Sequence, residues 1–374
     1  MSLRADYEQV IFKSIKMEAG AKWAQSRTNN DLVRNDQING NWIVNNQLSS
    51  QVNYTENSSA AYVSLAKQFG TDWSVKGGIR AEMTNSTGEW ISADTVTTKS
   101  YLDVFPTAFV GYTPNKNLRF GLSYTMRIQR PSFFQLNPFR MYIDANSSVE
   151  GNPNVNPQYN HQISLSLGVK QHLSFALHGQ FLNNAIIQNA YFNSQTGEKK
   201  LIWDNFGKQS FMGGSVSLTE FPITKWMIIN ANVFLANVEN KTEGYNSSSI
   251  FSNGNINTAF LLPKDYKVEL TGVFQSKIPY GYFTVDPTYE ISVGVKKGLF
   301  KNMGTLSLNV HDIFNSLKNN VSLNTDQLNA YYFTSLSRNR TITLSFQYRF
   351  GQSKGMKMRK VGNAEEASRV GNGN

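Results

Sequence analysis

The chain has 374 residues, of which 17% are charged and 13% aromatic, and its formal net charge is +10. The longest uninterrupted apolar runs are about four residues, such as Val233 to Ala236, whereas a membrane-spanning helix needs about 20. These features exclude a helical membrane protein. Because the chain has no cysteine, disulfide scaffolds, thiolate zinc sites and cysteine nucleophiles are excluded as well.

Strict alternation of apolar and polar residues dominates the chain and predicts an all-β protein. The pattern is clearest after Leu118, where Phe120 and Leu122 share one face of a strand and Arg119 and Ser123 share the other. In chain order, alternating segments occur around Tyr62, around Tyr101, at 118–128, 163–169 and 173–181, around Trp226, and at 266–274, 289–295 and 342–350. We expect an antiparallel β-barrel in which about 14 to 16 strands are present.

Short and long connections alternate between these strands. The short ones lie at 69–71, 114–116, 170–171, 222–224, 263–265 and 298–302. The long ones lie at 28–50, 87–98, 130–157, 191–199, 241–247, 280–285 and 314–330. Short turns on one side and long loops on the other are typical of outer-membrane barrels, in which the long loops face outside. We therefore expect the loop 130–157 to be extracellular and the turn 114–116 to be periplasmic.

A soluble β-sandwich, propeller or solenoid would also alternate, so these architectures are the alternatives. Three features count against them. The strands are longer than the usual five or six residues, their ends are rich in aromatic residues as in an interfacial girdle, and their polar faces carry charges that a lumen tolerates. The girdle candidates are Trp23, Trp73, Trp90, Tyr101, Tyr112, Trp203, Phe221, Trp226 and Tyr280. The charged polar-face residues are Lys76, Arg80, Glu82, Arg119, Arg127, Lys267, Glu269 and Lys296.

Several strings resemble a known family. They are RPSFFQLNPF from Arg130, EGNPNVNPQY from Glu150, VHDIFN from Val310, and a last strand that ends at Gly351 with YRFG. On these strings the chain resembles the C-terminal barrel portion of a Bacteroidetes-type TonB-dependent receptor, in the outer membrane protein beta-barrel family. The resemblance runs from about Ala5 to Gly351 and implies uptake of a nutrient across the outer membrane of a Gram-negative bacterium.

The resemblance also implies parts that these 374 residues do not contain. They are a signal peptide and an N-terminal plug that couples to the TonB system. The strand count adds to this expectation: about fifteen strands is an odd number, whereas bacterial single-chain barrels have even numbers, so the chain looks like the C-terminal part of a 22-stranded barrel. We therefore expect a fragment, in which residues 1–351 form an incomplete barrel. We expect residues 352–374 to form a flexible basic periplasmic tail, because Lys354, Lys357, Arg359, Lys360 and Arg369 outnumber Glu365 and Glu366.

Signals for catalysis, metals and cofactors are weak. Of the four histidines, His172 and His178 share one polar face, but six strand residues span about 20 Å, which is too far for one metal ion. No phosphate-binding glycine loop, nucleophile elbow or zinc-protease motif occurs in the sequence. We therefore assign no catalytic residue, no metal site and no cofactor, and we read Asp312 to Asn315 as a strand end and turn.

The segment after Arg130 supplies the candidate ligand-binding residues. They are Phe133, Phe134, Asn137, Phe139 and Tyr142, which would stand at the outer rim. The other interpretation, which we favour, is that Pro131 and Pro138 stiffen the exit from the strand and that the aromatic side chains anchor at the membrane interface.

Three functions remain open at this point. The first is a transport barrel whose partners are outer-membrane lipid, the plug and the TonB system. The second is a structural or adhesion barrel that does not transport. The third is a soluble basic protein that binds nucleic acid, which is disfavoured because most aromatic residues lie on the apolar strand faces and not beside lysine and arginine.

Overall fold

The computed structural model describes residues 1–45, 49–91, 94–242, 245–301, 303–323, 332–335 and 340–350. Within these residues the main element is one fifteen-stranded sheet in which each strand pairs with the next one of the sheet along the chain. Its strands are β1 (Ser2–Ile11), β2 (Ile15–Leu32), β5 (Ser50–Phe69), β6 (Trp73–Trp90), β7 (Thr95–Asn115), β8 (Leu118–Gln129), β11 (Gln158–Val169), β12 (Leu173–Asn183), β15 (Lys208–Thr224), β16 (Met227–Thr242), β17 (Tyr245–Leu262), β18 (Tyr266–Gln275), β21 (Thr288–Leu299), β22 (Gly304–His311) and β25 (Thr341–Tyr348).

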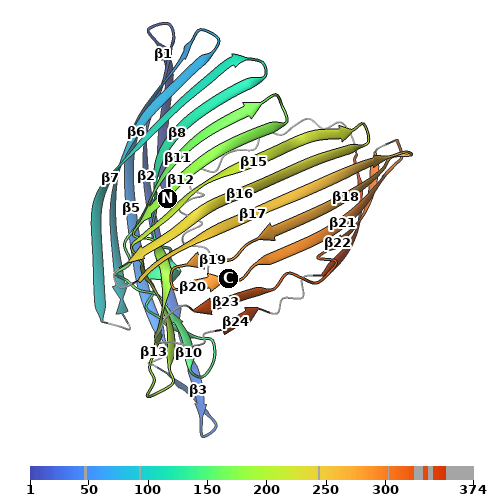
Figure 1. The fold of residues 1–374 in the computed structure, drawn as a ribbon. Coiled ribbons are helices and arrows are strands. Elements are labelled where there is room, and N and C mark those ends of the chain that lie inside the picture. The colour runs from blue at the N-terminus through green and yellow to red at the C-terminus, as the bar shows by residue number, and fades with distance from the viewer. Residues whose placement is uncertain are drawn as a thin grey trace.

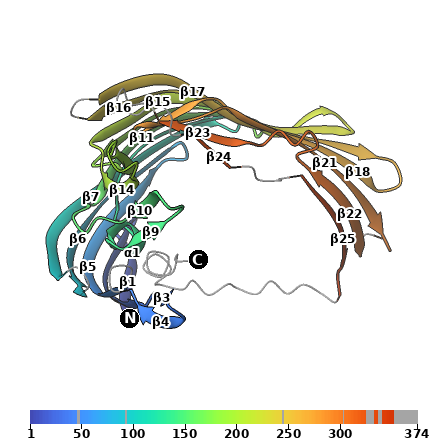
Figure 2. The same ribbon diagram turned by 90° about the horizontal axis from the view of Figure 1, so that it is seen from below.

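The predicted fold class and strand number are confirmed. All pairs in the large sheet are antiparallel, as the short turns require. The sheet curves into an open arc, and Figure 2 shows the opening between β1 and β25. Among the described residues, β1 and β25 each pair on one side only. The sheet is therefore a barrel wall that is not closed in this structure.

The smaller elements lie in the connections at one end of the sheet. The short β1–β2 turn lies at the top of Figure 1, and β3, β10 and β13 lie at the opposite end, which we call the long-loop end. These elements are β3 (Asn35–Ile38), β4 (Asn41–Val44), α1 (Phe133–Leu136), β9 (Arg140–Tyr142), β10 (Ser147–Glu150), β13 (Ile186–Phe192), β14 (Lys199–Asn205), β19 (Ile278–Tyr280), β20 (Phe283–Val285), β23 (Asn319–Leu323) and β24 (Tyr332–Ser335).

Two of the predicted long loops are shorter than expected. Strand β6 continues to Trp90, and β7 begins at Thr95. Strand β16 continues to Thr242, and β17 begins at Tyr245. Polar residues in 87–98 and 241–247 suggested loops, but residues 87–90 pair with 95–98, and residues 241–242 pair with 245–246, in strand conformation. The predicted tail 352–374 lies outside the described residues.

Apolar and polar residues lie on opposite faces of the sheet, as the alternation in the sequence predicts. On the convex face, Leu122 and Leu165 are 46% and 49% exposed, so no protein layer covers them. On the concave face, Glu82 and Thr84 are 6% and 0% exposed. Figure 2 shows α1, β9 and β10 lying inside the arc. The buried core of this protein therefore lies on the inside of the wall, beneath the folded loops.

Candidate functional site

The loop 130–157 begins with a buried arginine. The Arg130 guanidinium forms an ion pair with Glu82 of β6 and donates a hydrogen bond to the Thr84 hydroxyl at 2.8 Å. The side chains of Arg130 and Glu82 are only 4% and 7% exposed. Arg80 binds the other oxygen of Glu82 at 2.6 Å, and the Ser58 hydroxyl donates to Glu82 at 3.1 Å. The start of the loop is therefore fixed to the concave face by a carboxylate that two arginines share.

Helix α1 follows directly and closes over an apolar cluster. Ser132 and Gln135 form a capping box, in which the Ser132 N–H donates to Gln135 Oε1 at 2.9 Å. Leu136 then packs against Val52, Trp90, Val155 and Ile186, and the Phe133 ring stacks on the Trp90 ring with centroids 6.5 Å apart. Burial of these groups holds the loop against β5 and β6.

The two halves of the loop meet at a glycine. The Gly151 N–H donates to the Asn137 carbonyl oxygen at 3.0 Å, and the Asn152 N–H donates to the Gln135 carbonyl oxygen at 2.8 Å. A Cβ atom on residue 151 would lie 2.2 Å from the Asn137 oxygen, so only glycine fits here. The two strings that carried the family resemblance, from Arg130 and from Glu150, are therefore in direct contact.

The five predicted ligand-binding residues have different environments. Phe134 and Tyr142 are 38% and 46% exposed, whereas Phe133 packs against the buried cluster. Asn137 and Phe139 are half-buried, and Asn137 Oδ1 accepts a hydrogen bond from the Phe139 N–H at 3.2 Å. The expected membrane-interface anchoring is wrong for Phe133, because its ring turns inward onto Trp90.

Two girdle assignments are also wrong for the same reason. Trp90 is 1% exposed and donates its indole N–H to the Thr97 hydroxyl at 2.9 Å. Trp203 packs on the same buried cluster. A tryptophan at the end of a strand suggests an interface position, but Trp90 lies on the concave face beneath the folded loops, and Trp203 lies in β14, within those loops. Trp73, by contrast, is 45% exposed and stacks on Tyr112 at the short-turn end of the sheet.

The loop 130–157 is joined to the loop 184–207. Strand β10 pairs in parallel with β14, and four charged side chains bridge the two loops. Arg140 contacts Glu150 at 2.6 Å and Glu198 at 2.8 Å, and Lys200 contacts Glu198 at 3.4 Å. Sequence reasoning missed this pairing, because parallel strands in different loops leave no local pattern.

A third loop joins through aromatic contacts. The rings of Phe206, Tyr245 and Tyr282 lie 4.9 to 6.0 Å apart, and the Tyr280 hydroxyl donates to the Ile186 carbonyl oxygen at 3.4 Å. Gly281 allows the turn between β19 and β20, with a φ of +59°. The loops at this end therefore form one connected layer, which we call the loop cap (residues 130–157, 184–207 and 276–287).

Asp312 follows β22 and closes a turn, as the sequence predicts. Its carboxylate accepts hydrogen bonds from the Ser316 N–H at 2.8 Å and the Leu317 N–H at 3.1 Å. Burial raises the pKa of this carboxyl, but the N–H groups outweigh burial and hold the pKa below its usual range. The carboxylate is therefore engaged by the backbone of its own turn.

Two of the four histidines contact other polar groups of the sheet. His178 lies between the hydroxyls of Ser164 and Ser215, at 3.3 and 3.2 Å, and His172 contacts the Thr219 carbonyl oxygen at 2.9 Å. In the described part of the chain, no group of three or more His, Asp or Glu residues could hold a metal ion.

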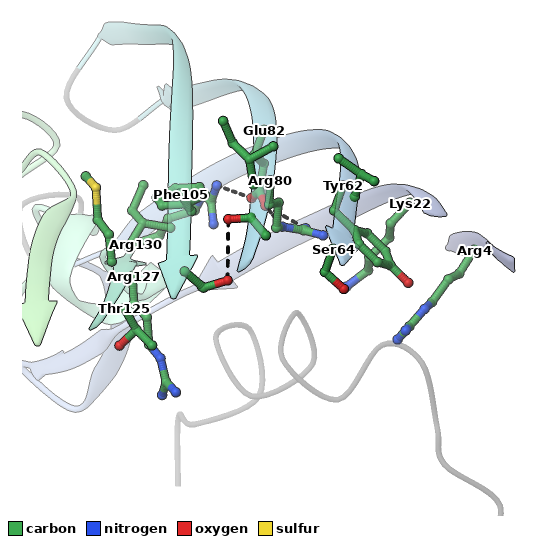
Figure 3. Close-up of a pocket in the computed structure, with 16 residues that line it drawn as sticks. Arg4, Lys22, Tyr62, Ser64, Arg80, Glu82, Phe105, Thr125, Arg127 and Arg130 are labelled. Atoms are coloured by element: carbon green, nitrogen blue, oxygen red, sulfur yellow. Dashed lines mark hydrogen bonds and ion pairs between the residues drawn. The ribbon is translucent and has the colours of Figure 1, made fainter. Parts of the chain in front are cut away.

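A cavity of about 480 Å³ opens on the concave face beside the buried Arg130–Glu82 pair. Strands β1, β2 and β5 to β8 line it, and Figure 3 shows its side chains. Five basic residues contribute to the wall, against the single carboxylate of Glu82; they are Arg4, Lys22, Arg80, Arg127 and Arg130. Pairing between β7 and β8 runs only from Thr107–Thr125 to Asn115–Leu118, although β7 starts at Thr95. The cavity lies where these two strands separate.

Comparison with known proteins assigns the family. The model of the outer membrane protein beta-barrel family matches residues 1–348. The chain belongs to the outer membrane protein beta-barrel family. This membership, together with the wall-like sheet, places the barrel in the outer membrane of a Gram-negative bacterium. No helix in the described residues is long and apolar enough to cross a membrane.

Solved structures share the fold of this outer-membrane barrel. The ferric-catecholate import receptor Fiu from E. coli K12 is 15% identical, with a TM-score of 0.64 over 93% of this chain and 54% of Fiu. The siderophore receptor PiuA from Acinetobacter baumannii is 12% identical, with a TM-score of 0.65 over 93% of this chain and 55% of PiuA. The ferric yersiniabactin uptake receptor FyuA from Yersinia pestis is 12% identical, with a TM-score of 0.61 over 94% of this chain and 53% of FyuA.

The chain therefore spans about half the length of these receptors. At such identities the likeness concerns the fold. No curated protein matches the chain.

Proposed function

We propose that this chain is the main part of an outer-membrane barrel that takes up a nutrient, and that it acts as a transporter and not as an enzyme. The observation that carries the proposal is the arrangement of the wall. Its convex face is apolar, its concave face is charged, and a connected loop cap covers the long-loop end. A lumen with a gated outer mouth is what an uptake barrel requires.

We further propose that additional strands and a plug complete the barrel. Strands β1 and β25 have the same direction, so they cannot pair antiparallel with each other. Each unpaired backbone group in the hydrocarbon region costs several kcal/mol, which an open wall could not tolerate over two strand edges. Seven more strands would give the 22-stranded size of plugged transporters. The energy would then come from the TonB system through the plug.

Uptake tests this proposal directly. A host that lacks the parent gene is grown with one iron, carbohydrate or peptide source limiting at a time, and uptake of that labelled source is measured. We expect a defect that the parent gene restores and that the 374 residues alone do not. Energy-dependent uptake by the 374 residues alone would refute the fragment proposal. Loss of surface attachment without any uptake defect would favour the structural or adhesion barrel.

The membrane orientation gives a second prediction. Cysteines are introduced at two exposed positions, Ala145→Cys in the loop cap and Lys116→Cys in the β7–β8 turn. Because the chain has no cysteine of its own, each label reports one site. In intact cells, an impermeant thiol reagent is expected to label the first variant and to leave the second unlabelled until the outer membrane is broken. The reverse pattern would invert the proposed orientation.

A further inference from the structure

The loop cap contains a four-stranded sheet, in the order β13–β14–β10–β9, which we call the loop sheet. Residues that pair across its strands share a face, and successive residues along a strand alternate between the two faces. One face carries Ile186 and Trp203, and both pack in the buried cluster beneath the loops. The opposite face, which we call the mouth face, therefore points away from the wall. Figure 2 shows β9, β10 and β14 inside the arc, so the mouth face lies over the interior.

The register of the loop sheet places one row of four side chains across the mouth face. Tyr142 of β9 pairs with Ser148 of β10. Ser148 pairs with Lys200 of β14, which pairs with Tyr191 of β13. The two tyrosines are 46% and 48% exposed. Three strand spacings, about 14 Å, separate their backbones, so two exposed aromatic rings lie at opposite ends of one polar row.

The surface between the tyrosines is polar and balanced in charge. Arg140 contacts Glu150 at 2.6 Å and Glu198 at 2.8 Å. Lys200 contacts Glu198 at 3.4 Å. Two bases therefore match two acids, and the pairing leaves little net charge to attract an ion. The surface instead presents donors and acceptors side by side, held in place by their contacts with one another.

Two polar atoms of the mouth face have no hydrogen-bond partner in the part of the chain that the structure describes. They are the hydroxyl of Ser148, which is 2% exposed, and the side-chain oxygen of Asn189. Asn189 lies two residues from Tyr191, on the same face of β13. An unpaired buried polar group costs free energy, so this face favours a ligand that brings hydroxyl groups, directly or through bound water.

We infer that the mouth face of the loop sheet binds a neutral oligosaccharide, with Tyr142 and Tyr191 as its principal contacts. The faces of sugar rings present C–H groups, which pack on aromatic rings, and sugar hydroxyls both donate and accept hydrogen bonds. The separation of the two tyrosines requires several linked sugar units. That the bound sugar is then transported rests on the proposed function, whereas the binding itself does not.

Binding is tested on the whole receptor in detergent, by isothermal titration with maltohexaose, cellohexaose and xylohexaose. Glucose is the single-unit probe, and a neutral hexapeptide of alternating glycine and serine is the peptide probe. We expect at least one hexasaccharide to bind, with a dissociation constant that changes little as salt increases, because the ligand carries no charge. Glucose is expected to bind at least about tenfold more weakly, since one ring reaches one tyrosine only. Binding of the peptide alone, or of no hexasaccharide, would overturn the inference.

Substitutions then locate the bound sugar. Tyr142→Ala and Tyr191→Ala are each expected to raise the dissociation constant about tenfold, because each removes one aromatic contact. Tyr191→Phe keeps the ring and is expected to retain most of the affinity. Unchanged affinity in the double variant with Tyr142→Ala and Tyr191→Ala would mean that the sugar binds elsewhere and would overturn the site.

The matched controls are the next residues along the same strands. Met141 and Phe192 are 42% and 43% exposed, close to the values of the two tyrosines, but they lie on the opposite face of the loop sheet. Met141→Ala and Phe192→Ala are expected to leave the dissociation constant unchanged. If they weakened binding as much as the tyrosine substitutions do, the mouth face would not be the binding surface.

Uptake and binding separate this inference from the proposed function. Sugar binding by a receptor that takes up no nutrient would contradict the transport function and leave the binding surface standing. Nutrient uptake by a receptor that binds none of the hexasaccharides would contradict the binding surface and leave the transport function standing.

Discussion

Replacing Arg130 by methionine is expected to detach the loop cap from the wall and to lower the free energy of unfolding by about 3 to 5 kcal/mol, because Glu82 and Thr84 would lose a buried partner. Arg80 would remain beside Glu82 but holds only one side of the carboxylate. The measurements are made on the whole receptor: they are urea-dependent folding in lipid vesicles and limited proteolysis, in which cleavage within residues 138–150 is expected to become fast.

Two controls accompany this prediction. Arg119→Met removes an exposed arginine from the same face and is expected to change the unfolding free energy by less than about 1 kcal/mol. The double variant with Glu82→Gln and Arg130→Met is expected to recover part of the loss, because no buried charge is then left unpaired. Equal effects of Arg130→Met and Arg119→Met would show that the buried pair does not anchor the loop cap.

Placing an arginine on the convex face is expected to oppose folding in lipid. Leu122 is 46% exposed on the apolar face of β8, and Leu122→Arg is expected to cost about 2 to 4 kcal/mol, the cost of a guanidinium near the middle of the lipid-facing surface. The measurement is the folded fraction of the whole receptor in vesicles against urea concentration.

The neighbouring residue is the control for this second prediction. Ser123 lies on the concave face, where it pairs across from Ser164 and faces the lumen with the charged residues. Ser123→Arg is expected to cost much less, since water reaches that face. If both substitutions had the same effect, the assignment of the two faces to lipid and lumen would be wrong.

Alternation in the sequence was enough to predict the wall. Side-chain direction in a strand changes at every residue, so the split between Leu122 and Ser123 follows from position alone. The short turns between strands require antiparallel neighbours, and this local rule led to a sheet of about fifteen strands in chain order. The strings around Arg130 and Glu150 were also sufficient to point to the family that residues 1–348 match.

The tertiary structure decided what lies inside the wall. Neither the pairing of Arg130 with Glu82 nor the burial of Trp90 can be read locally, because the partners are far apart in the chain and meet only through the register of the sheet. The parallel pair of β10 and β14 joins two loops that show no strand pattern of their own. The cavity beside Arg130 likewise forms only because six strands place their polar faces around it. Local periodicity determines on which face of a strand a side chain lies. Long-range packing determines which side chains from different strands meet inside the wall.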